Sequence, residues 1–239
     1  MTHIHLHNLS LTLPIYSQYS RSFKTSVINK VLGGHIENTK NSKHVIKILN
    51  NISFELNAGD RLGIIGHNGS GKTSLLRLLS RVYKNYTGSL QIKGTIASLI
   101  DISLGMDPEA TGYENIRMRG VMMGLKLSEI KKIENEIGEF SELGEYLNFP
   151  MKSYSTGMQM RLSFAISTTI NADIVIMDEW LSVGDESFQK KAEIRMQKLI
   201  SKNSILVLAS HSMELIKRNC NLVIRLEHGN YENILIDTL

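Results

Sequence analysis

The chain has 239 residues, of which 42% are apolar and 21% charged, and its net charge is +4. These values are ordinary for a globular protein, and no run approaches the roughly 18 apolar residues of a membrane-spanning helix. The first residues also lack the basic end and apolar core of a signal peptide, so we expect the protein to remain in the cytoplasm. The length favours one domain with an inserted subdomain, and the single cysteine, Cys220, cannot form an internal disulfide.

The positive charge is concentrated in residues 1–50, which contain six Lys or Arg residues and one acid. Such a segment either faces an anionic lipid or acidic partner or forms a solvated loop, and the sequence leaves both open. The chain contains no compact basic run and no array of aromatic residues interleaved with Arg. We therefore expect no nucleic-acid partner.

Residues 4–13 (IHLHNLSLTL) alternate between apolar and polar side chains, with one break in step near Asn8. This pattern predicts a strand, and we expect it to end at Pro14 because proline cannot donate to a sheet. Three histidines would project from one face of the strand. We expect a polar outer surface there rather than a metal site, because no fourth ligand is near. The three are His3, His5 and His7.

Tyr16 follows this strand, where its ring either stacks on an adenine or is an ordinary surface aromatic. Residues 17–43 are polar and form a long connection, which in a compact domain is usually functional or mobile. Residues 45–56 (VIKILNNISFEL) resume the strand pattern, and residues 57–60 predict a turn. The chain therefore opens with two strands joined by a long loop.

The sequence GHNGSGKT at residues 66–73 matches the phosphate-loop pattern G-x-x-x-x-G-K-[ST] at every fixed position. Residues 60–65 predict a buried strand before it and residues 74–80 a helix after it, which is the context that the pattern requires. Its glycines allow backbone N–H groups to converge on an anion, and the helix adds the positive end of its dipole. The predicted nucleotide contacts are Gly66, His67, Asn68, Gly69, Ser70, Gly71, Lys72, Thr73 and Ser74.

Two side chains of this loop have specific predicted roles. Lys72 supplies a mobile charge for the β- and γ-phosphates of ATP, and the hydroxyl of Thr73 is placed to hold Mg²⁺. An ordinary glycine turn would need neither, because a Lys-Thr pair has no packing purpose at an exposed helix start. The loop therefore predicts a site for the phosphates of a nucleotide with Mg²⁺.

Beyond the loop, residues 89–101 predict two short strands, and a helical stretch follows at about 111–170. Thr111 and Glu114 have the spacing of a capping box at the start of the first helix. A second helix is predicted to start at Ser128, because apolar residues then recur on one face. They are Ile130, Ile133, Ile137 and Phe140. This stretch predicts an all-helical insertion in an otherwise α/β chain.

Residues 173–179 (DIVIMDE) predict a buried strand that ends in two carboxylates. In a phosphate-loop fold, a strand beside the loop strand brings its terminal Asp to the metal, so Asp178 is the candidate Mg²⁺ partner. Glu179 follows one residue later, where a carboxylate can polarise an attacking water.

Ser155 is predicted to cap a helix that runs to about residue 170, and Gly157 allows backbone to approach a bound group closely. By itself this stretch is a well-capped helix. With the other motifs in the same order, it resembles the signature sequence of ABC transporter ATPases. In the same way, residues 182–185 (SVGD) lie where that family has its D-loop, and His211 follows a predicted strand, where the family has its switch histidine.

The resemblance covers essentially the whole chain and narrows to a subfamily. The signature reads YSTGMQMR at residues 154–161 rather than LSGGQ. Residues 178–188 and 107–115 look like those of exporters of bacterial surface polysaccharides, namely O-antigen, capsule and teichoic acid, and most like O-antigen export ATP-binding subunits. One departure is that the family's usual Q-loop glutamine is missing. Asp101 occupies that neighbourhood and is assigned as a metal or water contact.

The resemblance implies a phosphate-loop ABC ATPase core of the α/β class, with an antiparallel β subdomain and an inserted helical subdomain. It implies ATP hydrolysis in which Glu179 and His211 act together with the loop lysine. Two copies would form a head-to-tail homodimer. In that dimer Ser155, Gly157 and Asp185 of one copy would meet the ATP bound to the other.

The resemblance also implies a separate integral membrane channel subunit as partner, with a lipid-linked polysaccharide as the indirect cargo. The chain would then be a peripheral subunit at the cytoplasmic face of the inner membrane. A predicted strand at residues 222–226 and a turn at 227–229 come about a dozen residues before Leu239, too few for an independent domain of about 50 residues. We therefore expect no C-terminal carbohydrate-binding domain.

Two other classes of protein fit the sequence less well than this interpretation. A soluble ABC ATPase acting on DNA or ribosomes would need long coiled-coil arms or two cassettes in one chain, and the sequence contains neither. An unrelated phosphate-loop kinase or GTPase would not require the combination of Ser155, Asp185 and His211. Within the subfamily, export of capsule or teichoic acid remains the alternative to export of O-antigen.

Overall fold

The computed structural model describes residues 1–15, 36–38, 44–179, 184–200 and 204–236. Tyr16 and part of the predicted D-loop, Ser182-Val183, lie outside these residues, as does most of the predicted connection at 17–43. The chain divides into two compact units. The first comprises Met1–Ile96, Asp173–Trp180 and Lys202–Leu239, and the second comprises Ala97–Ala172 and Leu181–Ser201.

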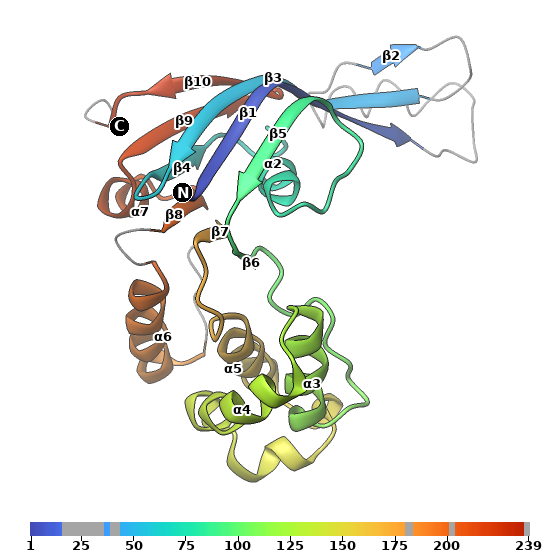
Figure 1. Cartoon of the computed structure of the whole chain (residues 1–239), viewed down its shortest axis with the longest axis vertical. Helices are drawn as coiled ribbons and strands as arrows, with labels where there is room; N and C mark the ends of the chain where they lie inside the picture. The colour runs from blue at the N-terminus through green and yellow to red at the C-terminus, as the bar shows by residue number, and fades with distance from the viewer. Residues whose placement is uncertain (16–35, 39–43, 180–183, 201–203, 237–239) are drawn as a thin grey trace. The chain divides into compact units, whose positions relative to one another are not determined.

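The described residues of the first unit form two sheets and two short helices (Figure 1). Its elements are β1 (His3–Ile15), β2 (Ile36–Asn38), β3 (His44–Asn57), β4 (Arg61–Ile65), α2 (Lys72–Leu79), β5 (Thr87–Lys93), β7 (Ile174–Asp178), β8 (Ile205–Ala209), α7 (Met213–Asn219), β9 (Leu222–Glu227) and β10 (Asn230–Ile234). Strand β6 (Ile96–Leu99) begins in this unit and ends in the second. The predicted strands and the phosphate-loop helix are confirmed, whereas β10, α7 and β2, which lies within the predicted connection at 17–43, were not predicted.

One sheet is antiparallel, in the order β2-β3-β1-β5. The predicted break in step at Asn8 is confirmed, because Asn8 has a φ of 48° and the register shifts between Leu6 and Leu9. The prediction that the first strand ends at Pro14 is wrong, because Pro14 pairs with Val45 and the strand continues to Ile15. The described pairing of β1 with β5 extends no further than Ser10, so proline costs no ladder hydrogen bond on that side.

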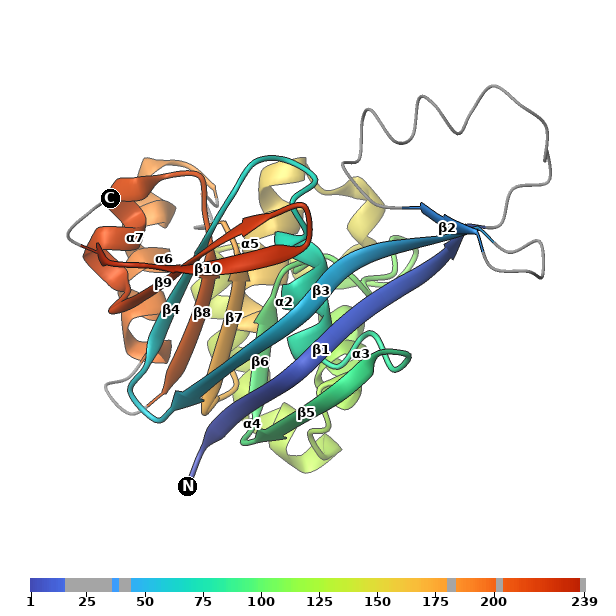
Figure 2. The same ribbon diagram turned by 90° about the horizontal axis from the view of Figure 1, so that it is seen from above.

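The other sheet places the ends of several strands along one edge (Figure 2). Within the first unit its order is β10-β9-β4-β8-β7. Strand β4 pairs in parallel with β8 and β9, and β8 in parallel with β7. The carboxyl ends of β4, β7 and β8 therefore lie side by side, which is where parallel α/β sheets bind ligands.

The second unit is helical and has its own core. Its helices are α3 (Gly112–Met122), α4 (Leu127–Ser141), η1 (Gly144–Asn148), η2 (Met151–Ser153), α5 (Thr156–Ser167) and α6 (Glu186–Leu199). The predicted capping box of Thr111 and Glu114 is confirmed, and α4 begins one residue before the predicted Ser128. Its predicted apolar face, which includes Ile130 and Ile137, packs into this core. Among the described residues, no helix is long and apolar enough to cross a membrane.

Helix α5 ends at Ser167, a few residues before the predicted end near residue 170. The hydroxyl of Thr168 donates to the carbonyl of Phe164 at 2.7 Å, and the hydroxyl of Thr169 donates to the carbonyl of Ala165, also at 2.7 Å. The hydroxyl of Thr169 takes the place of the backbone N–H that would bond to the Ala165 carbonyl if the helix continued, whereas the Phe164 carbonyl also accepts from the N–H of Thr168 at 3.0 Å.

Asn115 in α3 is a buried polar residue of the second unit, with 0% of its surface exposed, and its side chain joins α3 to the preceding turn. Its amide nitrogen donates to the carbonyls of Asp107, Ala110 and Thr111 at 2.9, 3.2 and 3.0 Å. Its amide oxygen accepts from the N–H of Asp107 at 2.7 Å. One side chain therefore fastens the whole turn that precedes α3.

Asn115→Ala is expected to reduce the free energy of unfolding by about 1–3 kcal/mol, because it removes the hydrogen bonds of a buried side chain and leaves the N–H of Asp107 without its acceptor. Urea unfolding followed by circular dichroism measures the change. Asn148→Ala is the matched control, since Asn148 is exposed and its side chain bonds, among the described residues, to Glu145 at 3.2 Å. A loss in Asn115→Ala no larger than that of the control would show that the turn does not depend on this side chain.

Candidate functional site

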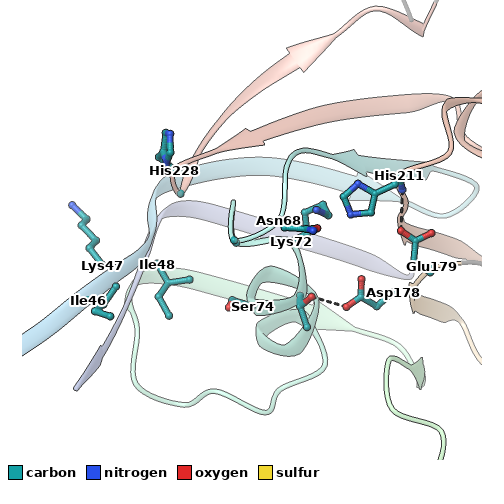
Figure 3. A pocket seen from close by; sticks show the side chains of 14 residues that line it. Ile46, Lys47, Ile48, Asn68, Lys72, Ser74, Asp178, Glu179, His211 and His228 are labelled. Carbon is teal, nitrogen blue, oxygen red and sulfur yellow. Dashed lines mark hydrogen bonds between the residues drawn. The ribbon is translucent and has the colours of Figure 1, made fainter. Parts of the chain in front are cut away.

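A cavity of about 500 Å³ opens in the first unit where the parallel strands end (Figure 3). This volume is in the range of small-molecule sites. The residues that line it come from β3, the phosphate loop, the ends of β7 and β8, and the turn between β9 and β10. They are Ile46, Lys47, Ile48, Asn68, Gly69, Gly71, Lys72, Thr73, Ser74, Asp178, Glu179, His211, His228 and Gly229.

The phosphate loop has the backbone that its glycines predict. Gly66 has a φ of 153°, and a Cβ there would lie 2.3 Å from the carbonyl oxygen of Leu226. Gly71 has a φ of 110° and precedes the first residue of α2. Only glycine can occupy both positions without displacing backbone, so the loop can curl in front of the helix N-terminus.

The turn between β9 and β10 supports this loop from outside. The N–H of Gly229 donates to the carbonyl of Ser70 at 3.1 Å, and the N–H of Asn50 donates to the carbonyl of Gly229 at 2.8 Å. The ring of His228 lies 4.9 Å from that of His67. Sequence analysis predicted the turn but not its contact with the phosphate loop.

Lys72 is held inside the loop, with 8% of its surface exposed. Its Nζ donates to the carbonyls of Gly66 and His67 at 2.8 and 3.1 Å. Burial lowers the pKa of this ammonium group below its ordinary value, and the negative charges of Asp178 and Glu179 oppose that shift. A cation is therefore kept at the helix start, within the field of two carboxylates.

The two predicted metal ligands of the first unit meet directly. The hydroxyl of Thr73 donates to Oδ2 of Asp178 at 2.6 Å (Figure 3). A hydroxyl and a carboxylate are the hard oxygen donors that suit Mg²⁺, which usually takes its remaining ligands from phosphate and water. The described residues contain no group of three or more His, Cys, Asp or Glu that could hold a metal by themselves.

Glu179 stands at the end of β7 with an unusual backbone, since its φ is 74°. Its N–H donates to the carbonyl of Ala209 at 2.8 Å. Its carboxylate accepts two hydrogen bonds, from the N–H of His211 at 2.9 Å and from the hydroxyl of Ser210 at 2.8 Å. The structure thus brings together the predicted carboxylates and the predicted histidine, and it adds Ser210, which sequence analysis missed.

Sequence analysis also missed the wall that β3 contributes. Ile46, Lys47 and Ile48 line the cavity on one side of the phosphate loop, and Asp178, Glu179 and His211 lie on the other (Figure 3). The alternation of residues 45–56 predicted a strand but did not indicate that one end of this strand lines the cavity.

Apart from Tyr16, which lies outside the described residues, the remaining predicted site residues belong to the second unit. The hydroxyl of Ser155 accepts from the N–H of Met158 at 3.2 Å, which confirms that Ser155 caps α5. Asp185 caps α6 and accepts from Arg161 at 2.6 Å. Ser155, Gly157 and Asp185 line one hollow of about 570 Å³.

Asp101 lies in a turn near Arg119 of α3. Burial lowers the pKa of the Arg119 guanidinium, and the negative charge of Asp101 opposes that shift. Asp101 is not among the residues that line the cavity of the first unit.

A phosphate loop, an acidic strand end and a histidine after the neighbouring strand, facing one cavity, define a nucleotide-binding cassette. The sequence model of the ABC transporter family matches residues 49–182, and the chain belongs to that family. It is an ABC-type ATPase.

The chain is similar to several proteins of known name. It is 42% identical to the O-antigen export system ATP-binding protein RfbE of Yersinia enterocolitica over 96% of both chains. It is 40% identical to RfbB of Myxococcus xanthus, which carries the same description, over 77% of this chain and 42% of that protein. It is 44% identical to the teichoic acids export ATP-binding protein TagH of Bacillus anthracis over 76% of this chain and 33% of that protein.

Solved structures agree on the fold. The chain superposes on an ATP-binding cassette, MJ0796, bound to ADP and Pi and described as dimeric, with a TM-score of 0.69 at 18% identity over 98% of both chains. An ATP-binding subunit of an ABC transporter gives a TM-score of 0.71 at 17% identity over 98% of this chain and 90% of that chain. The predicted ABC ATPase fold is confirmed.

Proposed function

We propose that this chain is the ATP-hydrolysing subunit of an exporter that moves a lipid-linked surface polysaccharide, O-antigen, across the inner membrane. The observation that carries the proposal is the 42% identity to an O-antigen export ATP-binding protein over 96% of both chains. A similarity that extends over both whole chains includes the elements that contact partners, and not only the nucleotide site. The chain would act at the cytoplasmic face, as a peripheral subunit of a separate membrane channel.

The cavity of the first unit supports binding of ATP with Mg²⁺. The N–H groups of the phosphate loop and the charge of Lys72 suit the phosphates. Thr73 and Asp178 would hold Mg²⁺, which when bound neutralises phosphate charge. Glu179 would take a proton from the attacking water, and His211, beside it, would contact the γ-phosphate.

The second unit supports a site shared between two copies. Ser155 caps the N-terminus of α5, which lies at a hollow of the second unit. The N-terminus of a helix is a favourable place for a phosphate. The nearest heavy atom to a Cβ built at Gly157 is 3.9 Å away, so the fold itself does not require glycine there. Ser155, Gly157 and Asp185 would therefore meet the ATP of a partner copy. Tyr16 would stack on the adenine, and Asp101 would replace the missing Q-loop glutamine.

An apolar surface of the second unit suits the channel subunit. Leu104, Val121, Met122 and Leu127 are exposed by 69%, 52%, 68% and 68%, and they lie on or beside the C-terminal end of α3. The turn that holds Leu104 approaches α3, since a Cβ on Gly105 would lie 3.0 Å from the sulfur of Met122. Gathered apolar side chains of this size usually mark a partner surface. We propose that a cytoplasmic segment of the channel docks there.

Teichoic acid or capsule is the alternative cargo, supported by the 44% identity to a teichoic acids export protein. That similarity covers only 33% of the relative, whereas the similarity to the O-antigen protein covers 96% of both chains. O-antigen is therefore the better supported cargo.

Deleting the gene is expected to leave polymer synthesised but trapped inside the cell, because a channel without its ATPase has no energy source. Immunoblots of intact and lysed cells measure surface and total polymer, and the composition of the trapped polymer distinguishes O-antigen from teichoic acid. The wild-type gene should restore the surface polymer, and a gene encoding Lys72→Ala should not. Normal surface polymer in the deletion strain, or co-purification with nucleic acid instead of a membrane protein, would contradict the proposal.

A further inference from the structure

Ser210, between β8 and the switch histidine, is a buried polar side chain to which the proposed mechanism gives no role. It is 0% exposed, and its N–H donates to the carbonyl of Ile64 on β4 at 3.2 Å. Its position is therefore set by two strands of the parallel sheet. Ser210 itself is not among the residues that line the cavity.

The contacts of the Ser210 hydroxyl indicate which group it donates to. Its oxygen accepts the N–H of Ser212 at 3.1 Å, and it lies 2.8 Å from Oε2 of Glu179. A hydroxyl carries a single hydrogen, and a carboxylate oxygen can only accept from it. With one lone pair occupied by Ser212, the hydrogen points to Glu179.

Glu179 needs such an anchor because its backbone is strained. A φ of 74° is the left-handed region, which is unfavourable for any residue with a side chain. Its backbone N–H and both carboxylate oxygens bond to the stretch Ala209–His211. Within the described part of the chain, the N–H of His211 holds one carboxylate oxygen and the hydroxyl of Ser210 holds the other, so Ser210 fixes the rotation of the carboxylate.

We infer that Ser210 is a positioning residue for ATP hydrolysis, which holds the carboxylate of Glu179 in the orientation that the attacking water requires. The inference rests on the proposed function of Glu179 as the general base. Ser210 acts through Glu179 and does not itself line the cavity. Hydrogen-bonded support of this kind matters because a displacement of about 1 Å at a reacting group can lower a rate about a hundredfold.

The test is steady-state ATP hydrolysis by the purified full-length protein. Ser210→Ala is expected to lower kcat between about ten- and a hundredfold, with the KM for ATP unchanged within about twofold. Ser210→Thr keeps the hydroxyl and is expected to recover most of the lost rate. Thermal unfolding of each variant checks that it is folded.

Ser212→Ala is the matched control. Ser212 caps α7, with its hydroxyl accepting from the N–H of Leu215 at 3.3 Å, and no hydrogen bond joins its side chain to Glu179. If Ser210 acted only by supporting the start of α7, Ser212→Ala would lower kcat as much as Ser210→Ala does. That result would overturn the inference, and so would a normal kcat in Ser210→Ala.

Glu179→Gln distinguishes a failure of the proposed role of Glu179 from a failure of the inference on Ser210. If Glu179→Gln abolishes hydrolysis and Ser210→Ala does not lower it, Glu179 is the base and only the inference on Ser210 fails. If Glu179→Gln keeps a near-normal rate, the proposed role of Glu179 fails, and the inference on Ser210 fails with it. Loss of rate in both variants, with recovery in Ser210→Thr, supports both.

Discussion

Replacing Glu179 by Gln is expected to lower the rate of ATP hydrolysis about 10²- to 10⁴-fold while leaving ATP binding intact. The amide cannot take a proton from the attacking water. Binding should persist because the groups that suit the phosphates, the loop and Lys72, are unchanged. If two copies share each ATP as we propose, a nucleotide that binds but is not hydrolysed should also stabilise the dimer.

The surroundings of Glu179 should accept the amide once the Ser210 hydroxyl turns its hydrogen away from residue 179. The amide oxygen can still accept from the N–H of His211, which in the wild-type protein donates to Oε1 of Glu179 at 2.9 Å. The amide nitrogen can donate to the oxygen of Ser210, because a serine hydroxyl rotates and can accept as well as donate. A loss of rate would therefore report the loss of the base rather than a misplaced side chain.

Phosphate release measures the rate, and titration calorimetry with MgATP measures binding. Glu214→Gln is the matched control, because Glu214 is an exposed carboxylate in the first turn of α7 that does not line the cavity. Its rate should stay within about twofold of the wild type. Near-normal hydrolysis in Glu179→Gln would mean that another group activates the water.

Ser155→Arg is expected to abolish hydrolysis while each subunit still folds and binds ATP. Ser155 is an exposed cap of α5, so losing its hydroxyl should cost only about 1 kcal/mol of stability. The long side chain would instead fill the hollow that we assign to the γ-phosphate bound to the partner copy. Ser153→Arg makes the same change two residues earlier, outside that hollow, and should keep most of the rate.

Mixing variants tests whether the site is shared. Ser155→Arg keeps the phosphate loop, and Lys72→Ala keeps the signature, so a mixed dimer would have one intact site. Random pairing of equal amounts should restore about a quarter of the wild-type number of sites, although each variant alone has none. Full activity of Ser155→Arg alone, or no recovery on mixing, would contradict a composite site.

The phosphate loop and the helix caps could be predicted from the sequence because they follow local rules. The glycine positions that allow φ values of 153° at Gly66 and 110° at Gly71 are specified by the loop residues themselves. The caps at Thr111 and Ser155 likewise depend on a side chain and the N–H three residues later. Strands β4, β7 and β8 were predictable because they are short apolar runs.

The walls and supports of the site depend on contacts between residues far apart in the chain, and only the tertiary structure decided them. Pro14 remains within a strand because β3 pairs with β1 there while the described pairing with β5 has ended. Ser210 meets Glu179, 31 residues away, because β7 and β8 are parallel neighbours whose ends coincide. The turn after β9 reaches the phosphate loop because β9 pairs with β4. The sequence by itself thus determined the phosphate loop, the acidic strand end and the helix caps, whereas strand pairing decided which residues hold them in place, because pairing joins segments whose contacts leave no local pattern.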